Sequence, residues 1–239
     1  MRTSSAELPP ELSQREHPVI ALAGMPNVGK STVFNALTGN WAGKTVASAV
    51  GTTVCCGETI LLADLPGTYS LRARSAEEAV ARDFLCFAKP DAAVVVCDAT
   101  CLERGLLLVM QVLETCPKAL LCVNLLDEAE KRHITIDLPR LEQCLGIPVV
   151  GVAARSGKGL AQLQERLHAL LHEDAPSPCP VPIPEQLEEP LQLVQAALPK
   201  NGNGLPPLWT AKRLLEPEPE LHEKIAAHLG ISLETGEIA

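Results

Sequence analysis

Several sequence features that are typical of nucleic-acid-binding, membrane-spanning or zinc-binding proteins are scarce or absent in this chain. Aromatic residues make up only 3% of its 239 residues, which leaves few platforms for stacking on nucleic-acid bases. The formal net charge is −9, whereas nucleic-acid-binding proteins usually present a basic surface. We therefore expect no nucleic-acid partner.

Long apolar runs are also missing. No run approaches the roughly 18 residues that a helix needs to cross a bilayer. Residues 1–17 are polar and lack the apolar core of a signal peptide. We expect residues 1–17 to form a flexible tail and the chain as given to be soluble and cytosolic.

Metal-binding patterns of cysteine are absent as well. The nine cysteines are scattered and none form a Cys-x-x-Cys pair, so we expect reduced thiols and no cysteine zinc site. A redox role for the adjacent Cys55 and Cys56 stays open. The six histidines do not cluster near any motif in the sequence, and we expect them at surface or helix positions.

The sequence does contain many short apolar runs that alternate with longer helix-like segments. The predicted strands are Val19–Ala23, Val46–Val50, Thr59–Ala63, Ala92–Cys97, Ala119–Val123 and Val149–Val152. The predicted helices are Ser31–Leu37, Ser75–Ala88, Leu102–Thr115, Leu138–Leu145 and Leu160–Leu171. This alternation predicts an α/β fold with a mostly parallel sheet flanked by helices, whose ligand lies at the carboxyl ends of the strands.

The composition changes near residue 173. Residues 174–184 carry five prolines and predict a linker between residues 18–173 and residues 185–239. The last segment predicts a small helical domain with helices at Glu185–Leu198, Leu208–Leu215 and Leu221–Leu229.

One stretch carries a specific chemistry. Its residues fit the phosphate-binding pattern G-x-x-x-x-G-K-[ST] and are Gly24, Met25, Pro26, Asn27, Val28, Gly29, Lys30 and Ser31. The two glycines let backbone N–H groups approach phosphate oxygens at the start of a helix. We expect Lys30 to reach the β- and γ-phosphates from a solvent-facing loop, the Ser31 hydroxyl to hold Mg²⁺, and Thr32 to line the same site.

A second motif follows the predicted strand Thr59–Ala63 and consists of Asp64, Leu65, Pro66 and Gly67. The Asp64 carboxylate can hold a Mg²⁺-bound water, and the Gly67 N–H can meet a γ-phosphate. Alone, Asp-x-x-Gly is usually a turn. Placed after a phosphate-binding loop, it indicates a nucleoside triphosphate site.

Two further motifs follow the strands Ala119–Val123 and Val149–Val152. The first consists of Asn124, Leu125, Leu126 and Asp127. One carboxylate can accept from both the N1–H and the 2-amino group of guanine, so Asp127 fits as the guanine reader and Asn124 as a tie to the phosphate loop. A polar helix cap is the plainer interpretation. In the second motif, Val152, Ala153 and Ala154 offer backbone N–H groups to the guanine 6-oxo group.

Four motifs in this order resemble the TRAFAC class of GTPases, and the residues in and around the motifs indicate a narrower family. They resemble the cytosolic N-terminal part of FeoB, the bacterial ferrous-iron transporter, over roughly residues 18–216. The stretches that carry the resemblance are Asn40-Trp41-Ala42-Gly43-Lys44-Thr45-Val46, Asp64-Leu65-Pro66-Gly67-Thr68-Tyr69-Ser70-Leu71, Asn124-Leu125-Leu126-Asp127-Glu128-Ala129 and Leu208-Trp209-Thr210-Ala211-Lys212-Arg213-Leu214-Leu215-Glu216.

The resemblance implies a G domain that binds GTP, GDP and Mg²⁺, then a helical domain that restrains nucleotide release. It also implies a transmembrane permease portion of the same protein, small soluble partner proteins, and a place at the cytoplasmic face of the bacterial inner membrane, and it allows an oligomer.

By the same resemblance, the first switch segment comprises Gly43, Lys44, Thr45 and Val46, with Thr45 as a Mg²⁺ ligand. Lys30, Thr45, Gly67 and Asn27 then act in catalysis, with Asn27 beside a K⁺ ion. This switch segment is shorter than is usual in the family, and Thr52-Thr53 is a rival to Thr45.

Thr68 stands where many GTPases carry a glutamine that orients water, so we expect slow hydrolysis. Two other functions remain open on the sequence alone. One is a stand-alone GTPase in ribosome or RNA maturation, and the other is a nucleotide sensor without turnover.

Overall fold

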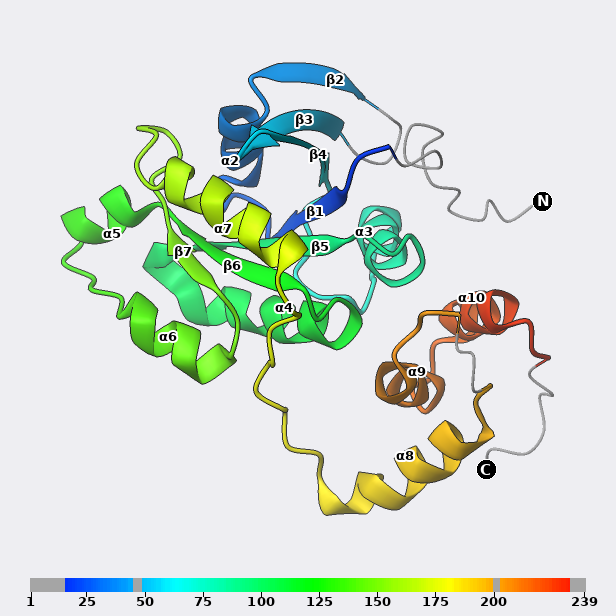
Figure 1. The fold of residues 1–239 in the computed structure, drawn as a ribbon. Helices are drawn as coiled ribbons and strands as arrows, with labels where there is room; N and C mark the ends of the chain where they lie inside the picture. Colours follow the sequence, from blue (N-terminus) through cyan, green and yellow to red (C-terminus); the bar gives the residue numbers. More distant parts are fainter. Residues whose placement is uncertain (1–15, 45–48, 200–202, 233–239) are drawn as a thin grey trace. The chain divides into compact units, whose positions relative to one another are not determined.

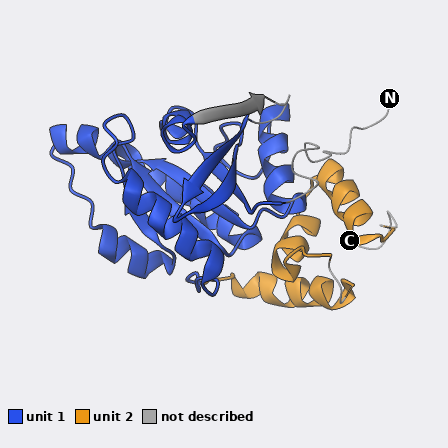
Figure 2. Cartoon of the chain, turned by 45° about the horizontal axis from the view of Figure 1, so that its top comes forward, with its two compact units in different colours: residues 1–179 blue, residues 180–239 orange. Residues whose placement is uncertain are grey.

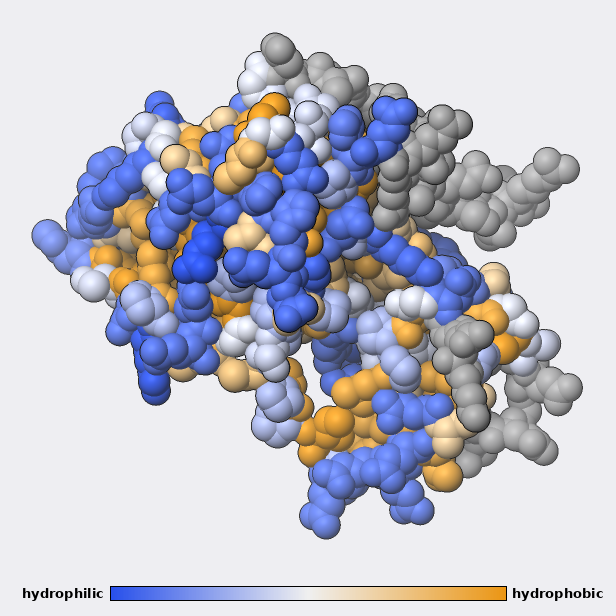
Figure 3. Space-filling view, in the orientation of Figure 1, coloured by the Kyte–Doolittle hydropathy of each residue, from blue (hydrophilic) through white to orange (hydrophobic). Residues whose placement is uncertain are grey.

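The computed structural model describes residues 16–44, 49–199 and 203–232, with only the backbone described for residues 40–44. The chain divides into two compact units, residues 1–179 and residues 180–239 (Figure 2). The boundary falls inside the proline-rich segment 174–184 that the sequence predicts as a linker. In Figure 3, hydrophilic residues cover much of the face of the first unit that is drawn there.

The first unit is built on one seven-stranded sheet with the order β2-β3-β4-β1-β5-β6-β7 (Figure 1). Its strands are β1 (Val19–Gly24), β2 (Asn40–Lys44), β3 (Ala49–Cys55), β4 (Glu58–Asp64), β5 (Ala92–Asp98), β6 (Ala119–Asn124) and β7 (Val149–Gly151). Strands β4, β1, β5, β6 and β7 are parallel to their neighbours in this series, while β2 and β3 are antiparallel. The predicted mostly parallel α/β sheet is thereby confirmed.

Helices cover both faces of this sheet. Alternate residues of β1 face opposite sides, so Ala21 joins one buried cluster and Leu22 the other. Burial on both faces explains why these strands are almost continuously apolar. Helices α2 and α7 contribute to the cluster around Leu22, and α3, α4, α5 and α6 to the cluster around Ala21. The helical segments are α2 (Lys30–Leu37), α3 (Ala76–Phe87), η1 (Ala99–Cys101), α4 (Leu102–Thr115), α5 (Leu126–Lys131), α6 (Leu138–Leu145) and α7 (Leu160–His172).

The antiparallel edge of the sheet differs from the sequence prediction. The predicted strand Val46–Val50 begins outside the described residues, and β3 continues five residues beyond it to Cys55. Strands β3 and β4 form a tight hairpin, because Cys56 and Gly57 both adopt the positive φ that a two-residue turn requires. Gly51 sits in this strand because a Cβ there would lie 2.7 Å from Cγ2 of Thr38 at the end of α2.

The second unit is helical and has its own apolar interior. Its helices are α8 (Glu185–Ala197), α9 (Pro207–Leu214) and α10 (Pro219–Leu229). The first and last residues of each helix lie within two residues of the predicted bounds. Trp209 of α9 is 2% exposed and lies in this interior with Leu191 and Ile225. Among the residues described, none of the helices combines the length and apolarity needed to span a membrane.

Candidate functional site

Four loops that carry the sequence motifs meet at one edge of the sheet. They follow β1, β4, β6 and β7, which are parallel, so their carboxyl ends point the same way. Strand β1 lies between β4 and β5, where the chain changes direction across the sheet. Open α/β sheets bind ligands at such a switch point.

The phosphate-binding loop runs from the end of β1 into the start of α2. Gly29 has φ 79° and is the residue immediately before the helix, and Asn27 has φ 67°. Asn tolerates this left-handed conformation better than most residues because its short polar side chain can bond locally. The first N–H groups of α2 lie at the end of this loop and have no partner within the helix, which creates an anion site.

Lys30 lies differently from the prediction. It is the first residue of α2 and only 8% exposed, so the expectation of a solvent-facing loop position is wrong. Its ammonium group donates to Oδ1 of Asp64, at the end of β4. The neighbouring strands β1 and β4 are parallel and in register, which brings the start of α2 next to the end of β4.

Asp64 also accepts a hydrogen bond from Ser31. Oγ of Ser31 lies 3.2 Å from Oδ2 of Asp64, so a hydroxyl and a carboxylate oxygen converge at the helix start. Magnesium prefers a small number of oxygen ligands with water completing its octahedron. The donor chemistry of Ser31 and Asp64 therefore fits Mg²⁺.

The loop after β4 packs directly on the phosphate loop. The Thr68 N–H donates to the Gly24 carbonyl at 3.1 Å, and a Cβ on Gly67 would lie 3.2 Å from Cγ of Pro26. The Thr68 side chain is fully buried, and its hydroxyl donates to the Ser70 carbonyl at 2.6 Å. Thr68 therefore uses its hydroxyl inside its own loop.

Asn124, at the end of β6, connects two of the motif loops. Its amide nitrogen donates to the Val28 carbonyl at 3.0 Å, and its amide oxygen accepts from the Ala154 N–H at 3.1 Å. The side chain is 1% exposed, so both bonds are protected from water. A Cβ on Gly29 would lie 2.4 Å from the same amide nitrogen, a close approach that the sequence did not predict.

Asp127 lies in the first turn of α5 and is half-buried. The preceding Leu125 has φ 65°, which costs roughly 1 kcal/mol for such a residue. Backbone strain of this kind tends to occur at functional loops. The Leu126 N–H donates to the Val152 carbonyl at 3.2 Å, so the Asp127 loop and the Val152-Ala153-Ala154 loop are held together.

The first switch segment is described only in part. Gly43 and Lys44 belong to β2, while Thr45 and Val46 lie outside the described residues. Lys44 pairs with Ala49, which in turn pairs with Asp64, so β2 ends beside the site. The rival Thr52 pairs with Leu61, three residues before Asp64 and therefore about 10 Å from it along the strand. Thr52 and its neighbour Thr53 are too distant to share an ion with Asp64.

Sequence comparison gives a consistent family. The model for ferrous iron transport protein B matches residues 18–167. The Fe(2+) transporter FeoB of Helicobacter pylori is 43% identical over 144 residues, which are 58% of this chain and 22% of that protein. FeoB of Escherichia coli K12 is 39% identical over 155 residues, 61% of this chain and 20% of that protein. The chain thus spans about a fifth of the length of these curated relatives.

Solved structures agree with the sequence comparison. The cytosolic domain of the T. maritima FeoB iron transporter in a GDP form has a TM-score of 0.80 and 35% identity, covering 93% of this chain and 88% of that one. The FeoB G domain from Methanococcus jannaschii has a TM-score of 0.62 and 40% identity, covering 66% and 100%. The ribosome or RNA alternative is not favoured by these relatives. Because the family model covers more than half of its length, the chain belongs to the ferrous iron transport protein B (FeoB) family.

Proposed function

We propose that this chain is the GTP-binding, slowly GTP-hydrolysing module of a ferrous-iron transporter, located at the cytoplasmic face of a bacterial inner membrane. The observation that carries the proposal is the buried Asn124 amide, which joins the phosphate loop to the loop after β7. This bond pair holds the loop proposed to cradle the phosphates next to the loop proposed to contact the guanine base. The T. maritima cytosolic domain, solved in GDP and GMPPNP forms, supports it.

In this proposal, the phosphates lie on residues 24–32, with Lys30 turning from Asp64 to the β- and γ-phosphates. Ser31, Asp64 and Thr45 hold Mg²⁺, which supplies charge neutralisation of the phosphate oxygens. The Gly67 N–H donates to the γ-phosphate. Asp127 accepts from the guanine edge, and the backbone of Val152-Ala153-Ala154 meets the 6-oxo group.

Hydrolysis should be slow because Thr68 is buried and its hydroxyl is already bonded to Ser70. Backbone N–H groups and bound ions then carry most of the transition-state stabilisation. The exposed Asn27 offers a neutral oxygen next to the phosphates, where K⁺ can bind. The partners that follow from the family are a permease portion of the same protein and small soluble proteins.

The base specificity of the site provides the test. Adenine presents an acceptor where guanine presents its N1–H donor, so the half-buried Asp127 carboxylate would be left unpaired, at a cost of about 1–3 kcal/mol. The protein should therefore bind GTP and GDP in preference to ATP by at least roughly tenfold. Asp127→Asn should lose guanine preference and gain affinity for xanthine nucleotides, measured by competition with a fluorescent nucleotide.

Glu128→Gln is the matched control, because Glu128 is the next carboxylate of α5 and pairs with Lys131. This variant should keep the guanine preference. Equal affinity of the parent protein for ATP and GTP would overturn the proposed function.

A further inference from the structure

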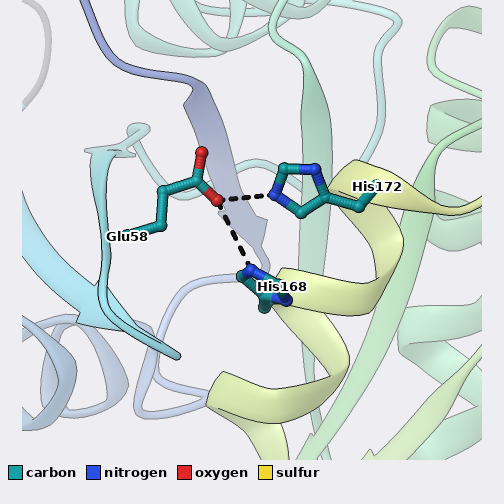
Figure 4. Close-up of side chains that lie close together, drawn as sticks. All are labelled: Glu58, His168 and His172. Carbon is teal, nitrogen blue, oxygen red and sulfur yellow. Dashed lines mark hydrogen bonds and ion pairs between the residues drawn. The ribbon is translucent and has the colours of Figure 1, made fainter.

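A cluster of three potential metal ligands lies at the opposite end of β4 from Asp64. Glu58 is the first residue of β4, and His168 and His172 are four residues apart on α7 (Figure 4). We propose that Glu58, His168 and His172 form a binding site for a divalent transition-metal ion, separate from the nucleotide site. Along β4, Asp64 lies six residue steps from Glu58, a distance of about 20 Å in an extended strand.

The three side chains converge on a small volume. Nε2 of His172 lies 2.6 Å from Oε2 of Glu58, and Nε2 of His168 lies 3.7 Å from the same oxygen. One ligand atom from each residue lies within 4.8 Å of the others. Ligand atoms around a tetrahedral zinc ion are about 3.3 Å apart, given bond lengths near 2.0–2.1 Å. Small side-chain movements therefore suffice to place all three atoms on one ion.

An ordinary hydrogen bond explains only part of this arrangement. The bond between His172 and Glu58 uses one imidazole, whereas Nε2 of His168 is too far for a hydrogen bond and still faces the same carboxylate oxygen. The two imidazole rings are 4.5 Å apart between centroids and tilted by 45°, so they are not stacked in parallel. Two imidazole nitrogens and one carboxylate oxygen that lie this close together supply the donor atoms of a His₂-carboxylate ligand set.

The ligands are carried by elements whose positions are fixed. Helix α7 is anchored in the core by Leu163, Leu167 and Leu170, and residues four apart on a helix share one face. Between α7 and β3, Nε2 of Gln164 lies 3.5 Å from Oγ1 of Thr53. Glu58 is positioned by the tight β3–β4 hairpin. Preorganised ligands lose little entropy on binding, which favours a real site over a chance encounter.

The ligand types select the class of ion. Imidazole nitrogen with carboxylate oxygen suits Zn²⁺, Fe²⁺ and neighbouring first-row metals, and Mg²⁺ and Ca²⁺ prefer sites made of oxygen alone. His168 and Glu58 are about one-third exposed and His172 about half exposed, so water can complete the coordination. A bound ion would join the β3–β4 hairpin to the end of α7.

Titration of the whole chain with metal tests the proposal. Calorimetry with Zn²⁺, and anaerobically with Fe²⁺, should show one saturable site per chain, and a tenfold excess of Mg²⁺ should not compete. His168→Asn, His172→Asn and Glu58→Gln should each weaken binding by roughly tenfold or more. Zn²⁺ should also raise the melting temperature of the parent and leave that of the three variants nearly unchanged.

Two control variants separate this site from other ligands. His133→Asn removes an exposed histidine outside the cluster, and Cys56→Ser removes an exposed thiol two residues from Glu58. Both should bind Zn²⁺ as the parent does. The proposal is overturned if the parent shows no saturable site, if Cys56→Ser abolishes binding, or if the three cluster variants bind like the parent.

Discussion

At the scale of single residues, Lys30 and Asp64 determine both the charge and the stability of the site. Lys30 is buried and donates to Asp64, whose side chain is 12% exposed. Removing one member of such a pair leaves the other charge poorly solvated, which usually costs more than the pair contributes. The two residues therefore have a structural role in addition to the proposed ligand contacts.

Lys30→Ala should lower the free energy of unfolding by about 2 kcal/mol, because among the described residues Asp64 then keeps only the Ser31 hydroxyl as a partner. The same change should weaken GTP binding by roughly 100-fold or more, about 2.7 kcal/mol. Adding Asp64→Asn to Lys30→Ala should restore part of the stability but none of the affinity. Urea unfolding of both single variants and the double variant measures the coupling; simple additivity would contradict a stabilising role for the pair.

Asn27 provides a second prediction at this scale. Potassium should raise the kcat of GTP hydrolysis by roughly tenfold over sodium while changing GTP affinity little, because negative charge grows in the transition state. Asn27→Ala should remove this difference, and Asn35→Ala, on the exposed face of α2, should retain it. Steady-state turnover in KCl and NaCl of equal ionic strength measures both. Identical rates of the parent in the two salts would mean that the short switch segment does not complete a cation site.

These residues also mark how far sequence reasoning reached inside the site. The pattern G-x-x-x-x-G-K-[ST] indicates a phosphate loop, but it carries no information about which side chain from another strand lies opposite Lys30. The burial of Lys30 follows from the register of β1 with β4, and the closeness of Gly29 to Asn124 follows from the order of β1, β5 and β6 in the sheet. The motif predicted that Asn124 ties to the phosphate loop, but the burial of Lys30 and the contact of Asn124 with Gly29 in particular depend on long-range strand pairing that no local pattern encodes.

At the scale of elements, the junction between the phosphate loop and α2 depends on a glycine with two separate requirements. Gly29 needs a positive φ, and it must leave room for the Asn124 amide. The buried Asn124 side chain would be displaced by any Cβ at this position. Its bonds to Val28 and Ala154 would then be lost together.

Gly157 separates these two requirements. It has nearly the same φ, 80°, but a Cβ there would meet no atom within 4 Å. Gly157→Ala should cost only the backbone strain, about 1–2 kcal/mol. Gly29→Ala should cost clearly more and should weaken GDP binding, which Gly157→Ala should not. Urea unfolding and GDP titration of the two variants test this, and equal losses would mean that Asn124 adapts without breaking its bonds.

Prediction of elements succeeded where periodicity was strong. The apolar strands β1, β5 and β6 and the amphipathic α4 and α7 begin and end within one residue of their predicted bounds. The hairpin of β3 and β4 was only half predicted. In the sequence, Gly51-Thr52-Thr53 resembles a break in a strand. In the structure, these residues alternate between buried and exposed positions because α2 packs over one face of β3.

At the scale of the whole molecule, all nine cysteines lie in the first unit, between residues 55 and 179. Cys56, Cys144 and Cys179 are exposed, and most of the others are buried. Burial raises the pKa of Cys97 and of Cys116 to about 12, which leaves little thiolate at neutral pH. The reactivity of these thiols therefore reports whether the first unit is folded.

Iodoacetamide at pH 8 should modify Cys56, Cys144 and Cys179 in the native protein, and Cys97 and Cys116 only on unfolding; peptide mass spectrometry identifies the sites. Stability should also depend on pH. Unfolded thiols ionise near pH 8.5, so their burial stabilises the fold fully below that pH, and this contribution is lost as pH rises toward 12. Rapid native labelling of Cys97 would contradict the buried position of β5.

The pairing of Lys30 with Asp64 has one further consequence, which concerns cooperativity between ligands. In the proposed function, nucleotide phosphates need Lys30 and the magnesium ion needs Asp64, so either ligand arriving alone must separate the pair and leave one charge without its partner. The ligand that arrives second finds its residue already released. Nucleotide and magnesium should therefore bind with positive cooperativity, and each should raise the affinity of the other by the same factor.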